Sequence, residues 1–143
     1  MSKSQGTFIE VNLSSLKHNF DYIKSLISKK TKVLVVVKAY AYGSNPVKIA
    51  AFLEKLKVDY FAVAYTSEAV KLREFGIKKP ILVFHPQAEN LSTIIKHNLI
   101  PTLYSFKMLE FFKDIVSRKK VKNYPVHLKI NTGLNRIGFS TQD

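Results

Sequence analysis

Cysteine is absent from these 143 residues, so the chain can form neither disulfides nor thiolate metal sites. No apolar stretch approaches the roughly 20 residues that a membrane-spanning helix needs. The opening residues 1–6 contain no apolar core of a signal peptide. We therefore expect a cytoplasmic protein with no membrane partner and no bound metal.

Glycine is scarce as well. The five glycines are dispersed along the chain, and they form neither the G-x-G-x-x-G turn of dinucleotide-binding proteins nor a P-loop. These two common signatures of nucleotide phosphate binding are therefore excluded.

Acidic residues are few: ten stand against 23 lysines and arginines, which gives a formal net charge of +13. Such a charge raises nucleic acid as a partner. However, only Arg73, Arg118 and Arg136 are arginines, and arginine is the residue that reads guanine in sequence-specific contacts. The lysines are scattered rather than gathered in a stripe. We expect solvated lysine faces and no nucleic-acid partner, with a basic interaction protein left as an alternative.

What the sequence does contain is a regular alternation of apolar runs and helical patterns. An apolar content of 46% is typical of one globular domain. Residues 1–30 read as a leading strand, near residues 9–12, followed by a helix. Residues 31–143 hold five strands that begin near residues 33, 60, 81, 99 and 125, with helices between them. The predicted helix N-caps are Asn12, Asn45, Thr66 and Ser105.

Strands that alternate with helices predict an α/β fold with a parallel sheet, either doubly wound or a (β/α)8 barrel. Five units are fewer than the eight of a closed barrel, so a barrel would be partial. Polar residues that follow the strands support the barrel, because barrel enzymes build their sites at that edge of the sheet. These residues are Lys38, His85, Tyr104 and Lys129.

Lys38 is the most informative of them because it follows the wholly apolar run 33–37. A lysine desolvated at the end of a buried strand can lose its proton and act as a Schiff-base nucleophile. The alternative is that Lys38 only marks the point where a strand meets water.

Two tracts resemble the alanine racemases of the fold-type III pyridoxal-phosphate enzymes. Residues 36–43 read V-V-K-A-Y-A-Y-G, and residues 127–139 read H-L-K-I-N-T-G-L-N-R-I-G-F. The stretch from Ala62 through Gly76 and the opening Asn12-Leu13 also follow the family pattern. The resemblance covers essentially the whole chain, in order. It departs from the pattern at Tyr40, at Ser44-Asn45 and at Asn131, which replaces an aspartate.

The resemblance implies a role for four residues of this chain. Lys38 would hold pyridoxal 5'-phosphate as a Schiff base and return as one of two catalytic bases. Tyr42 would bind the cofactor phosphate, and Arg136 would reach the phenolic oxygen of the cofactor and the substrate carboxylate. Lys129 would be carbamylated, which would let it pair with Arg136 rather than repel it.

The implied activity is interconversion of L-alanine and D-alanine, the latter a component of bacterial peptidoglycan, by a homodimer. Family enzymes are longer, and their second base is a tyrosine of a β domain that acts across the dimer. We therefore expect residues 1–143 to be the N-terminal part of the barrel domain and to be inactive alone. Two alternatives stay open: a module that binds pyridoxal phosphate without turnover, and a racemase or decarboxylase of another amino acid on the same scaffold.

Overall fold

The computed structural model describes residues 6–140; most of the opening predicted to lack a signal core lies outside this range. None of the described helices is both long and apolar enough to cross a bilayer. The strands are β1 (Leu34–Val36), β2 (Tyr60–Val63), β3 (Ile81–Val83), β4 (Ile100–Leu103) and β5 (His127–Leu128). The helices are α1 (Leu13–Ser25), α2 (Lys38–Gly43), α3 (Pro46–Lys55), α4 (Thr66–Glu74), α5 (Leu91–Lys96) and α6 (Phe106–Arg118), with a 3₁₀ turn η1 (Ala88–Asn90) before α5.

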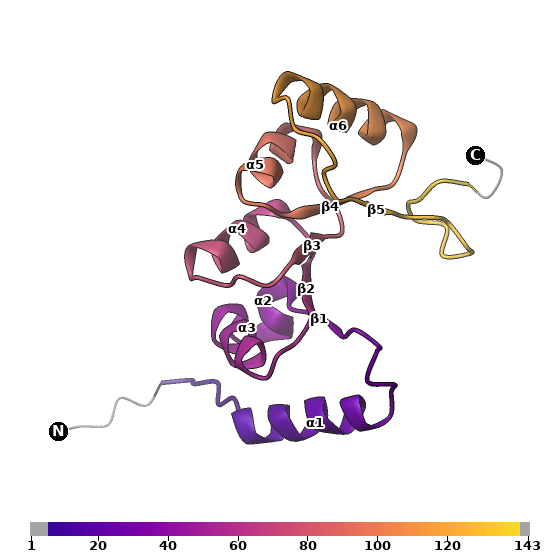
Figure 1. Cartoon of the computed structure of the whole chain (residues 1–143). Coiled ribbons are helices and arrows are strands. Elements are labelled where there is room, and N and C mark those ends of the chain that lie inside the picture. The colour runs from indigo at the N-terminus through magenta and orange to yellow at the C-terminus, as the bar shows by residue number, and fades with distance from the viewer. Residues whose placement is uncertain (1–5, 141–143) are drawn as a thin grey trace.

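The five strands form one sheet in the order β1-β2-β3-β4-β5, and every neighbouring pair is parallel. A doubly wound sheet would reverse its strand order at a switch point, whereas this sheet follows the chain throughout. Figure 1 shows α3, α4, α5 and α6 side by side on one face of the sheet. The prediction of a partial (β/α)8-type barrel is therefore confirmed, and the doubly wound alternative is wrong.

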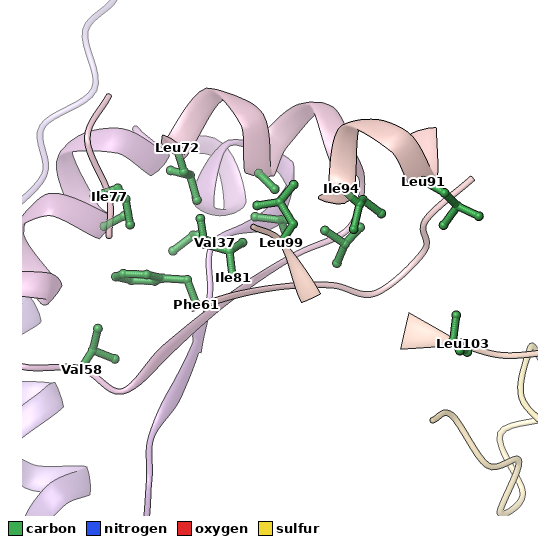
Figure 2. Packing of buried hydrophobic residues seen from close by; sticks show 14 of the residues in the cluster. Val37, Val58, Phe61, Leu72, Ile77, Ile81, Leu91, Ile94, Leu99 and Leu103 are labelled. Atoms are coloured by element: carbon green, nitrogen blue, oxygen red, sulfur yellow. The ribbon is translucent and has the colours of Figure 1, made fainter. Parts of the chain in front are cut away.

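The main core lies between the sheet and these helices. Alternate strand residues point to this face because side chains in a strand alternate, and Figure 2 shows them packed against apolar side chains of the helices. The most completely buried members are Val37, Phe61, Val63, Ile81, Val83, Leu99 and Leu103 from the strands and strand ends, with Leu53, Leu72, Leu91 and Ile94 from the helices.

The opposite face of the sheet carries a second, smaller cluster. Ala62, Leu82 and Ile100 are its buried members, and Phe84 packs against them. In a closed barrel this face is the interior. The side chains that continue this face beyond the strand ends form the candidate site.

The helix starts follow the predicted caps at three of four positions. The side-chain oxygens of Asn12, Asn45 and Ser105 accept backbone N–H bonds at 2.9, 3.0 and 3.2 Å from the residue three positions on. Thr66 is not a cap. It is the first residue of α4 and is buried, and the carboxylate of Glu68 takes the capping role by accepting the Tyr65 N–H at 3.0 Å.

Three strand predictions need correction. The predicted leading strand near residues 9–12 is not formed: Ile9 is 72% exposed, and a lone extended segment has no neighbour to share its hydrogen bonds. The fifth strand, predicted to begin near residue 125, covers only His127–Leu128. β1, expected to be buried on both faces, is half-buried because it lies at the edge of the sheet.

Arg73 ties two loops together at the amino edge of the sheet. Its guanidinium donates to the carbonyls of Ile77 and Lys79 at 2.7 and 2.8 Å, before β3, and to those of His97 and Asn98 at 3.1 Å, before β4. Burial lowers the pKa of Arg73, and Glu54 opposes that shift. Four carbonyls thus depend on one side chain.

Tyr124 supports the same edge. Its hydroxyl hydrogen-bonds to the carbonyls of Ile94 and Leu99 at 3.0 and 2.8 Å, and burial raises its pKa to about 12. The phenol therefore stays protonated in the folded chain at pH values where an exposed tyrosine ionises. Stability should decline as the pH rises from about 10, the usual value, to about 12, because only the unfolded chain gains the charge there.

We expect Arg73→Ala to lower the free energy of unfolding by about 3 kcal/mol, since it leaves several partly buried carbonyls without a donor. Urea unfolding followed by circular dichroism measures the change. Arg118→Ala is the matched control: Arg118 pairs with Asp114 on the exposed face of α6, and its loss should change the free energy of unfolding by less than about 0.5 kcal/mol. Equal effects of the two substitutions would contradict the assigned role.

Candidate active site

Lys38 lies where the chain leaves the sheet. The ladder continues one residue past β1, because the Val37 N–H donates to the Ala62 carbonyl at 2.9 Å. Lys38 follows at once and is half-buried. The structure thus places it at the carboxyl edge of the sheet, as predicted from the sequence.

Directly after Lys38 the backbone becomes left-handed. Ala39, Tyr40, Ala41 and Tyr42 have φ values of 50° to 57°, and Gly43 follows with φ 90°. Each non-glycine residue in this conformation costs roughly 1–2 kcal/mol. Such strain persists only where surrounding contacts fix the backbone, and it is concentrated at functional sites. No sequence pattern predicted this turn.

Hydrogen bonds at both ends hold the left-handed segment. The Ala41 N–H donates to the Val37 carbonyl at 3.2 Å, and the Ser44 N–H donates to the Tyr40 carbonyl at 2.7 Å. The Ser44 hydroxyl also donates to the Ala41 carbonyl at 2.8 Å. The first residue of the segment, Ala39, donates its N–H to the Glu68 carboxylate at 2.7 Å.

Lys129 reaches the same edge from β5. Its N–H donates to the Leu103 carbonyl at 2.9 Å, and its carbonyl accepts the Phe139 N–H at 2.8 Å. The loop between Lys129 and Phe139 folds back on itself, because the Asn131 N–H donates to the Phe139 carbonyl at 2.8 Å. Arg136 lies in this loop.

Two residues shape the loop. The Asn131 side-chain oxygen accepts the N–H groups of Gly133 and Asn135 at 3.3 and 3.0 Å, so the asparagine that departs from the family pattern closes the turn. Gly138 has φ 133°, and a Cβ there would lie 2.8 Å from the Asn131 nitrogen. The loop that carries Arg136 therefore requires glycine at this position.

Lys38, Lys129 and Arg136 line one cavity of about 530 Å³. The remaining lining residues are Ala64, Tyr65, Phe84, His85, Thr102 and Ile137. Three cationic side chains and no carboxylate form this wall, so the cavity attracts anions. The sequence predicted the three cations but gave no role to Tyr65 or Thr102.

Aromatic rings stack beside the cations. The rings of His85 and Tyr104 stack at 5.2 Å, and Tyr65 meets His85 edge-on at 6.0 Å. The Tyr104 hydroxyl donates to the Pro86 carbonyl at 3.1 Å. Burial, and secondarily the charge of Glu89, raises the pKa of Tyr104. Tyr104 is thus held by Pro86 and stacks on His85, a residue of the cavity lining.

Tyr42 does not join this cavity. The left-handed turn leaves its side chain 70% exposed, and it is not among the lining residues. Three of the four residues singled out by the resemblance are brought together, and Tyr42 is not. Its contact with a cofactor phosphate stays a prediction.

The cavity residues fit pyridoxal phosphate by their chemistry. A lysine amine suits the cofactor aldehyde, arginine and lysine suit anionic oxygens, and the lining residues Phe84 and His85 are aromatic, like the cofactor ring. Thr102 is 6% exposed, and its hydroxyl has no hydrogen-bond partner among the described residues. A buried hydroxyl without a hydrogen-bond partner is uncommon. Because Thr102 lines the cavity, its hydroxyl is available to hydrogen-bond a ligand there.

Comparisons with known proteins give one consistent result. The family described as "Alanine racemase, N-terminal domain" matches residues 11–143. Alanine racemase 1 of Caldanaerobacter subterraneus subsp. tengcongensis is 47% identical over 135 residues, which is 93% of this chain and 34% of that protein. The alanine racemase of Thermodesulfovibrio yellowstonii is 41% identical over 91% of this chain and 36% of its own length.

The fold comparison agrees. An alanine racemase of Clostridium difficile 630, solved in complex with cycloserine, superposes with a TM-score of 0.86 at 40% identity and covers 90% of this chain and 35% of its own. The alanine racemase of Bacillus anthracis with bound L-Ala-P gives a TM-score of 0.80 at 26% identity over 89% of this chain and 33% of its own. This chain spans about a third of the length of the curated relatives it matches.

The left-handed segment generates a stability prediction. Ala39 is exposed, so Ala39→Gly removes backbone strain without removing packing. We expect stability to be unchanged or raised by up to about 1 kcal/mol in urea unfolding, because glycine tolerates this conformation. Ala51→Gly, in right-handed α3, is the control and should cost about 0.5–1 kcal/mol. A comparable loss at Ala39 would argue against the left-handed turn.

Proposed function

Since the chain belongs to the alanine racemase family, we propose that it forms the cofactor-anchoring wall of a pyridoxal-phosphate-dependent enzyme that interconverts L-alanine and D-alanine. One observation carries the proposal. Lys38, Lys129 and Arg136 come from the two ends of the sheet and line one cavity at its carboxyl edge, where barrel enzymes hold their substrates. A cytoplasmic location stays a prediction from the sequence.

In this proposal Lys38 has two tasks. Its Nζ would hold the cofactor through the aldehyde group, and it would take or return the α-proton on one face of the substrate. When bound, pyridoxal phosphate makes that proton acidic by drawing electrons away from the α-carbon. The half-buried position of Lys38 at the mouth of the cavity suits both tasks.

Arg136 and Lys129 are proposed to act as a pair. A guanidinium binds a carboxylate through two parallel hydrogen bonds, so Arg136 would orient the substrate carboxylate and the phenolic oxygen of the cofactor. Two cations in one cavity repel each other. Carbamylation of Lys129 would replace its ammonium with an anionic group able to pair with Arg136. Tyr42 is proposed to bind the cofactor phosphate from α2, outside the wall formed by these two residues.

Racemisation needs a base on each face of the α-carbon. Among the described residues that line the cavity, we assign proton transfer to Lys38 alone. We propose that the second base is a tyrosine from outside residues 1–143, supplied across a homodimer, and that these residues alone do not racemise alanine. A module that binds the cofactor without turnover is the corresponding alternative for the isolated chain.

The proposal predicts selective chemistry at Lys38. The folded chain is incubated with pyridoxal phosphate and reduced with borohydride, and labelled lysines are located by peptide mass spectrometry. Lys38 should be labelled about tenfold more than Lys113, a difference in binding free energy of about 1.4 kcal/mol. Lys113 lies on exposed α6 and pairs with Glu110, so it reports ordinary surface reactivity. Uniform labelling of the lysines would contradict the proposed anchor.

A chiral assay tests turnover. The 143-residue chain should form no more D-alanine from L-alanine than its Lys38→Ala variant. The reason is that the chain supplies only one of the two proposed bases, Lys38. A longer protein that contains these residues should convert alanine faster than serine, lysine or arginine. D-alanine formation by the isolated chain above the variant's background would overturn the proposed need for a second base, and preference for another amino acid would overturn the substrate.

A further inference from the structure

Glu68 occupies an unusual position in α4. One carboxylate oxygen accepts the Ala39 N–H at 2.7 Å. The other accepts the N–H groups of Ala64 and Tyr65 at 2.8 and 3.0 Å. The two oxygens are thus divided between two neighbouring strand ends, the one after β1 and the one after β2.

Both strand ends belong to the candidate site. Ala39 directly follows Lys38, and Ala64 and Tyr65 line the same cavity as Lys38. We infer that Glu68 is a positioning residue: its carboxylate fixes the end of β1 against the end of β2 and so holds the Lys38 side chain at the cavity. This inference rests on the proposed function of Lys38 as the cofactor anchor.

The left-handed segment explains why such a tie is needed. Four consecutive left-handed residues follow Lys38, and their strain favours relaxation of the turn. The Ala39 N–H lies at the start of that turn. A carboxylate that accepts it forms a charge-assisted hydrogen bond, which is about twice as strong as a neutral one.

A second contact from α4 acts on the same segment. The Lys71 ammonium lies 5.5 Å from the centre of the Tyr40 ring, within the range of a cation–π interaction. Glu68 and Lys71 are three residues apart and therefore share one face of the helix. That face of α4 holds the first two residues after Lys38, by the backbone of Ala39 and by the ring of Tyr40.

Replacing Glu68 with glutamine separates the two functions of the carboxylate. Glutamine has one acceptor oxygen and one donor group. If its oxygen keeps the two N–H groups after β2, its NH₂ faces the Ala39 N–H, and the tie to the Lys38 end is lost. The shape of the side chain is otherwise preserved.

Glu54 offers a matched control at the opposite edge of the sheet. Its carboxylate accepts the N–H groups of Lys78 and Lys79 at 2.8 and 2.7 Å, before β3 and far from Lys38 along the strands. Both N–H groups bond to one oxygen of Glu54, so Glu54→Gln removes a charge of the same kind while its amide oxygen can keep both hydrogen bonds. A purely structural role for Glu68 predicts that the labelling of Lys38 follows stability in both variants.

The experiment measures borohydride-trapped pyridoxal phosphate at Lys38, relative to Lys113, in the wild-type chain and both variants, with urea midpoints recorded in parallel. We expect the ratio of Lys38 to Lys113 labelling to fall about tenfold in Glu68→Gln. In Glu54→Gln the ratio should stay within about twofold of the wild-type value, even if the urea midpoint falls as much as it does in Glu68→Gln. Glu68→Asp, which keeps the charge with a shorter reach, should be intermediate, and it replaces Glu68→Gln in the comparison if that variant does not fold.

The outcomes are distinguishable. Equal ratios in the wild type and Glu68→Gln, or equal losses in the Glu68 and Glu54 variants, would overturn the positioning role and leave the proposed function intact. A wild-type chain without preference for Lys38 would instead overturn the proposed function, and the inference with it.

Discussion

Parallel pairing of strands that are consecutive in the chain is the constraint on which the rest of this structure depends. Each strand pairs with the next, so each connection must return across the sheet, and the connecting helices gather on one face. The carboxyl ends of all strands then meet at one edge. Lys38 and Lys129 are distant in the sequence, but each follows the carboxyl end of a strand of the same parallel sheet. They therefore line the same cavity.

Charged side chains at the two edges of the sheet differ in the partners that they contact. At the amino edge, Arg73 donates hydrogen bonds to backbone carbonyls and Glu54 accepts them from backbone N–H groups. These hydrogen bonds stabilise the loops. At the carboxyl edge, Lys38, Lys129 and Arg136 take part in none of the ion pairs found among residues 6–140. In the proposed function these charges bind the ligand. Glu68 at the same edge instead accepts backbone N–H groups, so this edge combines residues that support the backbone with residues proposed for chemistry.

Local signals in the sequence predicted most of this arrangement. Apolar runs located the strands, and Asn45 and Ser105 located helix starts, because both kinds of signal act over a few residues. Lys38 and Lys129 were placed at the correct edge for the same reason. The sequence failed where the outcome depends on distant contacts. The segment 9–12 lacks a strand partner, and the N-cap of α4 is Tyr65, whose N–H bonds to the Glu68 carboxylate, rather than Thr66.

The left-handed turn is the clearest case of tertiary control. Alanine and tyrosine do not favour a positive φ. Their local preferences therefore do not predict the left-handed conformation of residues 39–42. The conformation is held by local hydrogen bonds and by an atom of another element, the Glu68 carboxylate at Ala39. It leaves Tyr42 exposed and outside the cavity lining, whereas Lys38 lines the cavity. The position of Lys38 thus depends on α4, which packs against β2 and β3 and reaches Ala39 through the Glu68 carboxylate. The last ladder hydrogen bond of the first strand is made by Val37, so the backbone after Lys38 depends on contacts outside the sheet, and the Glu68 carboxylate supplies one of them.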